Sequence, residues 1–164
     1  MMEIKDIKAE HYPQIAEIYS QGIATGVATF QTEAPGWAAW NNSHLPNCRI
    51  AAFEDKQMAG WAALSPVSSR CVYAGVAEVS VYVAENFRGK GVGKLLLLQL
   101  IEESEQAGLW TLQSGIFPNN TGSIQLHKQC GFRQIGYREK IGKKDGIWRN
   151  NIIMERRSKK VGVE

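Results

Sequence analysis

The sequence predicts an α/β fold with a mixed sheet, formed by one domain over residues 1–157. Two observations carry this prediction. Runs with the alternation of strands and runs with helical periodicity follow one another in the order β-α-(α)-β-β-β-α-β-α-β-β. No internal repeat and no linker-like segment divides the chain. The charged and small residues 158–164 predict a disordered tail.

The elements of the first half follow from local patterns. Apolar residues alternate in the strands, recur at helical spacing in the helices, and give way to Gly and Thr in the loop. We expect a strand over 1–9, a helix over 10–20, a loop over 22–35, a short helix over 37–45, and hairpin strands over 49–54 and 58–64.

The second half alternates strands with two helices that stop at glycines. Gly108 and Gly131 stand where a left-handed residue commonly ends a helix. We expect a connection over 65–75, a strand over 77–83, a helix over 94–107, a strand over 110–116, a helix over 122–130, and two strands over 132–139 and 147–155.

Composition excludes several classes of function. The net charge of +3 is concentrated in the tail, so we expect no nucleic-acid partner. The longest apolar run, residues 95–98, is too short to span a membrane. The three cysteines lack the spacing of metal ligands and are expected to be free thiols, with no metal bound. With no secretory signal at the start, these features predict a cytoplasmic protein.

The segment from Glu78 to Gly93 contains the strongest functional signal. An alternating strand leads into Arg88-Gly89-Lys90-Gly91-Val92-Gly93, and a helix follows. Backbone N–H groups of such a loop, together with the helix dipole, form a site for phosphate. The loop is not a Walker motif, because Leu95 stands where a hydroxyl residue is needed. It is not the dinucleotide fingerprint, because Lys94 replaces the third glycine.

Arg88-x-x-Gly91-x-Gly93 resembles the pyrophosphate loop of the GCN5-related N-acetyltransferases (the GNAT superfamily). The downstream pattern Asn120-x-x-Ser123, continuing to Gly131-Phe132, is similar to the second cofactor motif of this family. More narrowly, the chain resembles the branch that acetylates phosphinothricin and methionine sulfone or sulfoximine. That resemblance rests on Ile18-Tyr19, Ala28-Thr29-Phe30, Pro35, Arg70-x-x-Tyr73 and Gly146-x-Trp148, and it spans roughly residues 3–155.

The resemblance implies a GNAT fold: a mostly antiparallel sheet whose central strands splay apart to admit acetyl-CoA. Backbone groups of the strand would bind the pantetheine as an added strand would, and the loop would bind the pyrophosphate. The implied cofactor residues are Val81, Tyr82, Val83, Arg88, Gly89, Lys90, Gly91, Val92, Gly93, Asn120 and Ser123.

The resemblance also assigns the chemistry. Glu78 would act as the general base for the acceptor amine, and the N–H of Val81 would polarise the thioester carbonyl. Many relatives carry a tyrosine as general acid where this chain has His127. Either His127 or solvent would then protonate the departing thiolate. Transfer would be direct, since no motif supports Cys130 as a nucleophile and a buried helix thiol explains it.

The acceptor implied by the resemblance is the primary amine of a small L-amino acid or analogue. Arg70 would bind its carboxylate, and the other implied substrate residues are Phe30, Tyr73, Glu78, Val79 and Ser80. Members of this branch are commonly homodimers, and the strand bearing Trp148 is a candidate for the interface.

Two other functions remain open from the sequence. In the first, the acceptor would be a polyamine, an aminoglycoside or a protein N-terminus. The chain would be a non-catalytic sensor of acyl-CoA in the other, although a sensor has no use for the carboxylate of Glu78.

Overall fold

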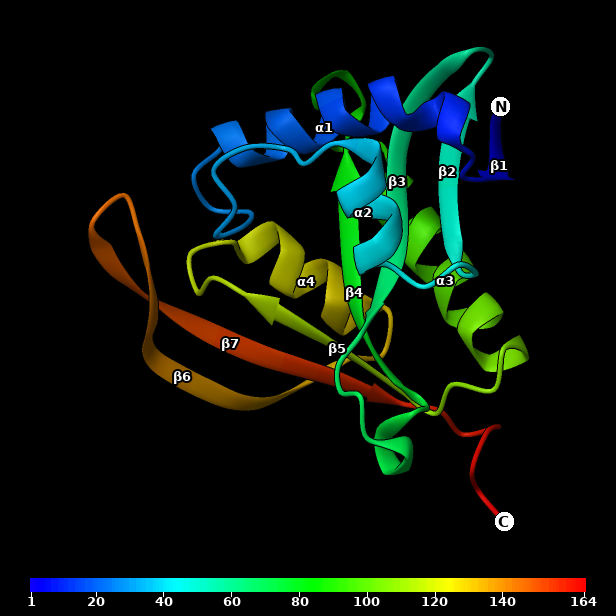
Figure 1. Ribbon diagram of the computed structural model, residues 1–164, viewed down its shortest axis with the longest axis vertical. Helices are drawn as coiled ribbons and strands as arrows, with labels where there is room; N and C mark the ends of the chain where they lie inside the picture. Colours follow the sequence, from blue (N-terminus) through cyan, green and yellow to red (C-terminus); the bar gives the residue numbers. More distant parts are fainter.

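Seven strands form one sheet in the order β1-β2-β3-β4-β5-β7-β6 in the computed structural model, which describes residues 1–164 (Figure 1). The strands are β1 (Met2–Asp6), β2 (Arg49–Glu54), β3 (Gln57–Pro66), β4 (Val76–Val83), β5 (Thr111–Ile116), β6 (Arg133–Lys144) and β7 (Ile147–Arg157). The α-helices are α1 (Tyr12–Ala24), α2 (Trp37–Ser43), α3 (Val92–Gln106) and α4 (Thr121–Gln129). Short 3-10 turns are η1 (Ala9–His11), η2 (Cys71–Tyr73) and η3 (Glu85–Phe87).

All neighbouring strands run antiparallel except β4 and β5, which run parallel in the middle of the sheet. A parallel pair needs a crossover connection, and α3 supplies it here. The predicted mixed, mostly antiparallel sheet and the order of elements are therefore confirmed.

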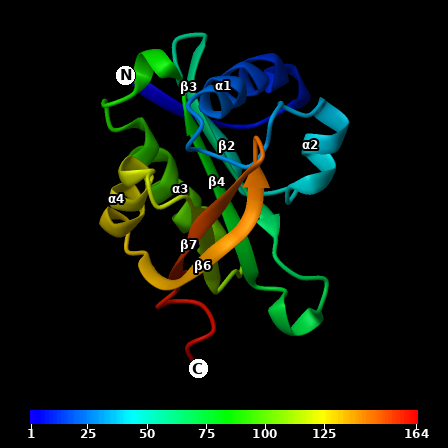
Figure 2. The same cartoon turned by 90° about the vertical axis from the view of Figure 1, so that its left-hand side faces the viewer.

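Helices cover both faces of the sheet, with α1 and α2 on one side and α3 and α4 on the other (Figure 2). On the α3 side, Leu96, Leu97 and Leu100 are fully buried. On the α1 side, Trp40 packs edge-on against Trp61, with 5.5 Å between ring centroids. The two layers explain the near-continuous apolar sequence of β2 and β3. None of the helices has both the length and the apolar character that a membrane span requires.

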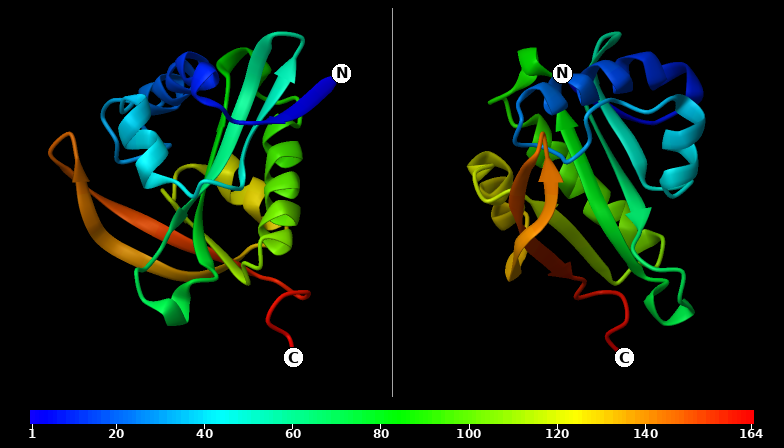
Figure 3. Two further views of the ribbon diagram at one scale, coloured as in Figure 1. Left: turned by 45° about the vertical axis from the view of Figure 1, so that its right-hand side comes forward. Right: turned by 60° about the vertical axis from the view of Figure 1, so that its left-hand side comes forward.

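Several strands and helices are longer than predicted, and the largest extensions are at the ends of α1 and β6. α1 continues to Ala24 rather than ending at residue 20, and β6 continues to Lys144 rather than ending at residue 139. The β6–β7 hairpin therefore projects as a long curved arm (Figure 3). Its tip residue Lys144 is buried and donates to the carbonyl of Thr29, a contact that no local pattern in the sequence reveals.

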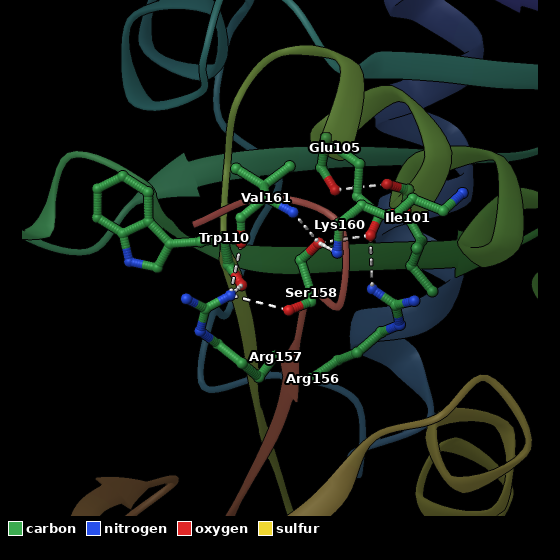
Figure 4. A network of polar contacts seen from close by, with 9 residues as sticks. Ile101, Glu105, Trp110, Arg156, Arg157, Ser158, Lys160 and Val161 are labelled. Carbon is green, nitrogen blue, oxygen red and sulfur yellow. Dashed lines mark hydrogen bonds and ion pairs between the residues drawn. The ribbon is translucent and has the colours of Figure 1, made fainter. Parts of the chain in front are cut away.

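The end of the chain differs from the predicted disordered tail (Figure 4). Ser158 is buried, and its hydroxyl donates to Glu105 Oε2 at 2.6 Å. Arg156 lies 3.6 Å from the same carboxylate. The guanidinium of Arg157 donates to the carbonyls of Trp110, Ser158, Val161 and Gly162. Arg157 and Ser158 thus bind residues 158–162, which we expected to be disordered, to the domain.

Candidate active site

The cleft of the molecule opens where β4 and β5 separate. They pair only from Val76 with Thr111 to Glu78 with Gln113, and beyond this point the strands diverge. A cleft of about 740 Å³ lies there, lined by the rest of β4, the end of β5, the start of α3, one side of α4 and the loop after α1. The predicted splay of the central strands is therefore present.

The free edge of β4 presents backbone groups to this opening. Ala84 donates its N–H to Ala59 of β3 at 2.8 Å. Because successive N–H groups of a strand alternate in direction, those of Val81 and Val83 point away from β3. Both residues line the cleft. The edge can therefore bind an extended ligand, as a neighbouring strand would.

Glycines bring the backbone of the loop before α3 to the cleft. Gly89 and Gly91 have φ angles of +77° and +80°, which side chains disfavour, and Gly91 forms the N-cap of α3. No side chain caps this helix, so its first N–H groups are available to an anion. Gly93 has a different role, because a Cβ there would lie 3.2 Å from Leu126 of α4.

The two cations of the loop are placed differently. Arg88 lines the cleft, together with Gly89, Gly91, Val92 and Gly93. Lys90 does not line it, and its ammonium lies 5.4 Å from the centre of the Phe87 ring. The structure thus brings together all the predicted phosphate-loop residues except Lys90.

Asn120 and Ser123, at the start of α4, also line the cleft. Asn120 Oδ1 accepts the N–H of Ser123 at 3.2 Å, and its Nδ2 donates to the carbonyl of Val27. The Asn120 amide therefore caps α4 and holds the loop after α1 in place. Both of its polar groups are already engaged within the chain.

His127 is buried at the wall of the cleft, with its ring edge-on to Phe132. Its Nδ1 lies 2.7 Å from the carbonyl oxygen of Ser123, so Nδ1 carries a proton and donates it. Its Nε2 is buried without a partner. Burial lowers the pKa of His127, and the hydrogen bond to Ser123 opposes this only in part. The ring is therefore neutral near pH 7, with Nε2 as an acceptor.

Glu78 lies at the point where the two strands part. Its side chain is exposed and lines the cleft, and Oε1 accepts a 3.4 Å hydrogen bond from Gln113 Nε2. By alternation, Ser80 and Tyr82 share its face of the sheet. The ring of Tyr82 stacks 4.9 Å from Trp61, and burial raises the pKa of Tyr82, which keeps the phenol neutral.

The loop between α1 and α2 closes the side of the cleft above this face. Phe30 lines the cleft and packs edge-on against Phe117, with 4.7 Å between ring centroids. A Cβ at Gly142 of the β6–β7 hairpin would lie 3.2 Å from Phe30. Phe30 is thus both a packed residue and a wall residue of the site.

Arg70 and Tyr73, predicted to bind the acceptor, lie outside this cleft. Arg70 precedes η2, with its guanidinium 5.6 Å from the centre of the Tyr73 ring. Tyr73 lines a separate recess that also includes Gln113. The connection 65–75 runs away from the cleft (Figure 3). Neither Arg70 nor Tyr73 lines the cleft beside Phe30 and Ser80.

Other residues that line the cleft were not predicted from the sequence. They lie on the loop after α1 and on β5 and β7, and include Thr25, Val27, Ser114, Gly115 and Asn151. A polar residue beside Ile152-Ile153-Met154 was the only available signal for Asn151. Cys130 is buried, its pKa is raised by burial, and it does not line the cleft, which fits a structural thiol. No three His, Cys, Asp or Glu side chains gather as a metal site.

Comparison with known proteins identifies relatives over almost the whole chain. The profile of the family described as "Acetyltransferase (GNAT) family" matches residues 12–132. Phosphinothricin N-acetyltransferase of Alcaligenes faecalis is 31% identical over 161 residues, covering 93% of this chain and 81% of its own. L-methionine sulfoximine/L-methionine sulfone acetyltransferase of Pseudomonas aeruginosa is 28% identical, covering 93% and 92%.

A solved structure extends the likeness to three dimensions. It is a GNAT superfamily phosphinothricin acetyltransferase from Sinorhizobium meliloti in complex with acetyl-CoA, 28% identical in sequence. The two folds superpose with a TM-score of 0.89 over 99% of this chain and 91% of the other.

Proposed function

Since the chain belongs to the acetyltransferase (GNAT) family and is an acetyl-CoA-dependent N-acetyltransferase, we propose that its acceptor is the primary amine of a small L-amino acid or analogue. Two relatives of similar length are named for such analogues, phosphinothricin and methionine sulfoximine. The observation that carries the proposal is the position of Glu78, which lines the cleft beside the free edge of β4.

The proposed donor site uses backbone more than side chains. The edge groups of Val81 and Val83 would hold the amides of the pantetheine arm, with Tyr82 between them. The N–H groups from Gly89 to Gly93 would hold the pyrophosphate, with Arg88 as its cation. Lys90 would contribute only charge at a distance, since its ammonium lies over Phe87. Ser123 would complete the site, and Asn120 would support it through the α4 cap.

The proposed chemistry needs one base and one polarising group on this chain. Glu78 would accept the proton of the acceptor ammonium, directly or through one water. The N–H of Val81 would donate to the thioester carbonyl oxygen, where negative charge develops as the amine attacks. The acetyl group would pass to the amine without an acyl-enzyme, which agrees with the buried Cys130.

The departing thiolate must also gain a proton to become the free thiol of CoA. A neutral His127 whose Nδ1–H is already donated has no second proton to give. We propose that solvent supplies this proton at neutral pH. If His127 were the acid, activity would decline above its lowered pKa, and His127→Phe would abolish that decline. A solvent donor instead predicts the same alkaline limb of the kcat profile for both proteins.

The acceptor pocket is proposed to be formed by Phe30, Glu78, Val79 and Ser80. The place of Arg70 in the fold does not support the carboxylate clamp, and one variant decides the question. If Arg70→Ala raises the KM of an amino acid and leaves that of its decarboxylated amine unchanged, the clamp exists. If the substitution changes neither KM, or changes both equally, the carboxylate clamp does not exist.

We also propose a homodimer that works in the cytoplasm. The β6–β7 hairpin exposes apolar side chains that a second copy would cover, namely Ile135, Tyr137, Ile141, Ile147 and Trp148. The three cysteines are unpaired, as is usual in a reducing compartment. Sedimentation of the purified protein and fractionation of the source cells test the two points.

One experiment tests the function itself. Thiol release from acetyl-CoA is followed with a panel of L-amino acids, phosphinothricin, methionine sulfoximine, a polyamine, an aminoglycoside and an N-terminal peptide. We expect the highest kcat/KM with one of the small amino acids or analogues. Highest turnover of the polyamine or the peptide would refute the acceptor class, and tight CoA binding without turnover of any amine would indicate a sensor.

A further inference from the structure

Four buried side-chain polar atoms lack a hydrogen-bond partner: Trp40 Nε1, Trp61 Nε1, His127 Nε2 and Asn151 Oδ1. The two indoles lie in the core, whereas His127 and Asn151 line the cleft. An unsatisfied buried acceptor costs free energy, and in a binding cleft a water or a ligand can satisfy it. Asn151 thus places a buried acceptor without an internal partner at the wall of the cleft.

Strand register places Asn151 on the same face of the sheet as Glu78. Glu78 is paired with Gln113 across β4 and β5. Gly115, two residues after Gln113, is paired with Ile153 of β7. Asn151 lies two residues before Ile153. Paired residues share a face and steps of two preserve it, so the carboxamide and the carboxylate face the same side.

Gly115 makes the room that the Asn151 side chain occupies. A Cβ at Gly115 would lie 3.1 Å from both Oδ1 and Nδ2 of Asn151. The carboxamide therefore lies against bare backbone, in a position that a side chain on β5 would disturb. The pair is arranged so that an amide is kept at the cleft without an internal hydrogen bond to Oδ1.

We propose that Asn151 Oδ1 accepts a hydrogen bond from the acceptor amine, and that this contact selects primary over N-methylated amines. The inference rests on the proposed function. A primary ammonium gives up one proton to Glu78 before attack and a second to solvent water as the tetrahedral intermediate collapses, while a single N–H survives in the amide product. That surviving N–H is the donor for Asn151, and no proton passes to the carboxamide. An N-methyl amino acid lacks it.

The test compares an L-amino acid with its N-methyl derivative in wild type and Asn151→Leu. Leucine has a similar volume and no acceptor. We expect kcat/KM for the primary amine to fall about tenfold, the loss of one good hydrogen bond. The N-methyl derivative loses little, so the preference between the two substrates shrinks by the same factor. The KM for acetyl-CoA stays unchanged.

Stability gives a second readout, independent of turnover. Replacing an unsatisfied buried acceptor by an apolar group of the same shape is neutral or stabilising. We therefore expect Asn151→Leu to melt at or above the wild-type temperature while it loses its substrate preference. A merely structural asparagine would show the reverse combination.

Asn150 is the matched control on the same strand. Its Oδ1 accepts the N–H of Lys140 at 2.8 Å, and it does not line the cleft. Asn150→Leu should lower the melting temperature and leave the preference for the primary amine intact.

Each outcome leads to a decision. An unchanged substrate preference in Asn151→Leu overturns the proposal. A rise in the acetyl-CoA KM instead assigns the carboxamide to the pantetheine amides and overturns it as well. If wild type acetylates no amine, the proposed function fails and this inference falls with it. If wild type acetylates amines and Asn151→Leu keeps the wild-type preference for the primary amine, this inference alone has failed.

Discussion

Lys144 Nζ donates to the carbonyl oxygen of Thr29 at 2.6 Å, joining residues 115 positions apart in the chain. The bond ties the tip of the β6–β7 hairpin to the loop that carries Phe30. The wall of the proposed acceptor pocket is therefore supported from the far end of the sheet. Phe117, whose ring centre lies 6.0 Å from the Lys144 ammonium, belongs to the same support.

Lys144→Met should loosen this wall. Methionine keeps the length of the side chain and loses the donor, which leaves the Thr29 carbonyl without this partner. We expect the acceptor KM to rise by about 3- to 10-fold, the equivalent of one hydrogen bond, with the acetyl-CoA KM unaffected. Steady-state kinetics measure both. Lys128→Met, at an exposed position on α4, is the control. Equal rises in both KM values would contradict a local effect.

Glu78→Gln should reduce kcat at neutral pH by about 100-fold or more, the usual loss of a general base. The deficit should shrink as pH rises, because the free amine then forms without help from the protein. A pH series of kcat in both proteins measures this, with Glu102→Gln on the exposed side of α3 as the control. Full activity of Glu78→Gln at neutral pH would show that water or another group serves as base.

Gly91→Ala should weaken binding of CoA and destabilise the protein. A φ of +80° costs an alanine about 1–2 kcal/mol, and any relaxation of the loop misdirects its N–H groups. Calorimetric titration with CoA and thermal melting measure the two effects. Gly136→Ala, where the position is open and φ is not positive, should change neither. Retained CoA affinity in Gly91→Ala would argue against a backbone anion site.

Stability should decrease as the solution is acidified below about pH 6.5. Burial lowers the pKa of His127 and of His44, so between the unfolded and folded pKa values the unfolded chain binds more protons. Each histidine adds at most about 1.4 kcal/mol per pH unit to the slope in that interval. Urea unfolding at several pH values measures the slope, and His127→Gln should reduce it. A variant with the wild-type slope would exclude His127 as a source.

Trp148→Lys should shift the protein from dimer to monomer. Trp148 is 54% exposed and Ile147 beside it is 65% exposed, so a charge here opposes burial against a second copy. Light scattering at several concentrations measures the mass. An unchanged dimer would place the interface elsewhere, and a monomeric wild type would refute the homodimer.

The sequence was most informative where function depends on short spacing. The strand from Glu78, the glycines at residues 89, 91 and 93 and the stop at Gly108 were predictable, because each depends on local backbone geometry. The separation of β4 from β5 came from family resemblance and not from periodicity. Patterns of alternation specify a strand without specifying its neighbour.

Features set by distant contacts were not predictable. Arg70 and Tyr73 stand on a connection whose path no local signal determines, and it carries them to a separate recess. The charged and small residues of the tail predicted disorder, yet Ser158 donates a hydrogen bond to Glu105 on α3. The placement of the Asn151 carboxamide depends on the absence of a side chain at Gly115, on another strand.

The divergence of β4 from β5 leaves an unpaired strand edge, which bears on association with other protein chains. An unpaired strand edge invites any extended peptide to add to it, and proteins usually guard such edges at the rim of a sheet. Here the unpaired groups of Val81 and Val83 lie in the interior of the sheet order, between two paired strands. The start of α3, one side of α4 and the loop after α1 line the cleft around them, so this edge suits a narrow extended ligand better than a second sheet. The interior position of this edge therefore separates ligand binding from the pairing between sheets that leads to aggregation.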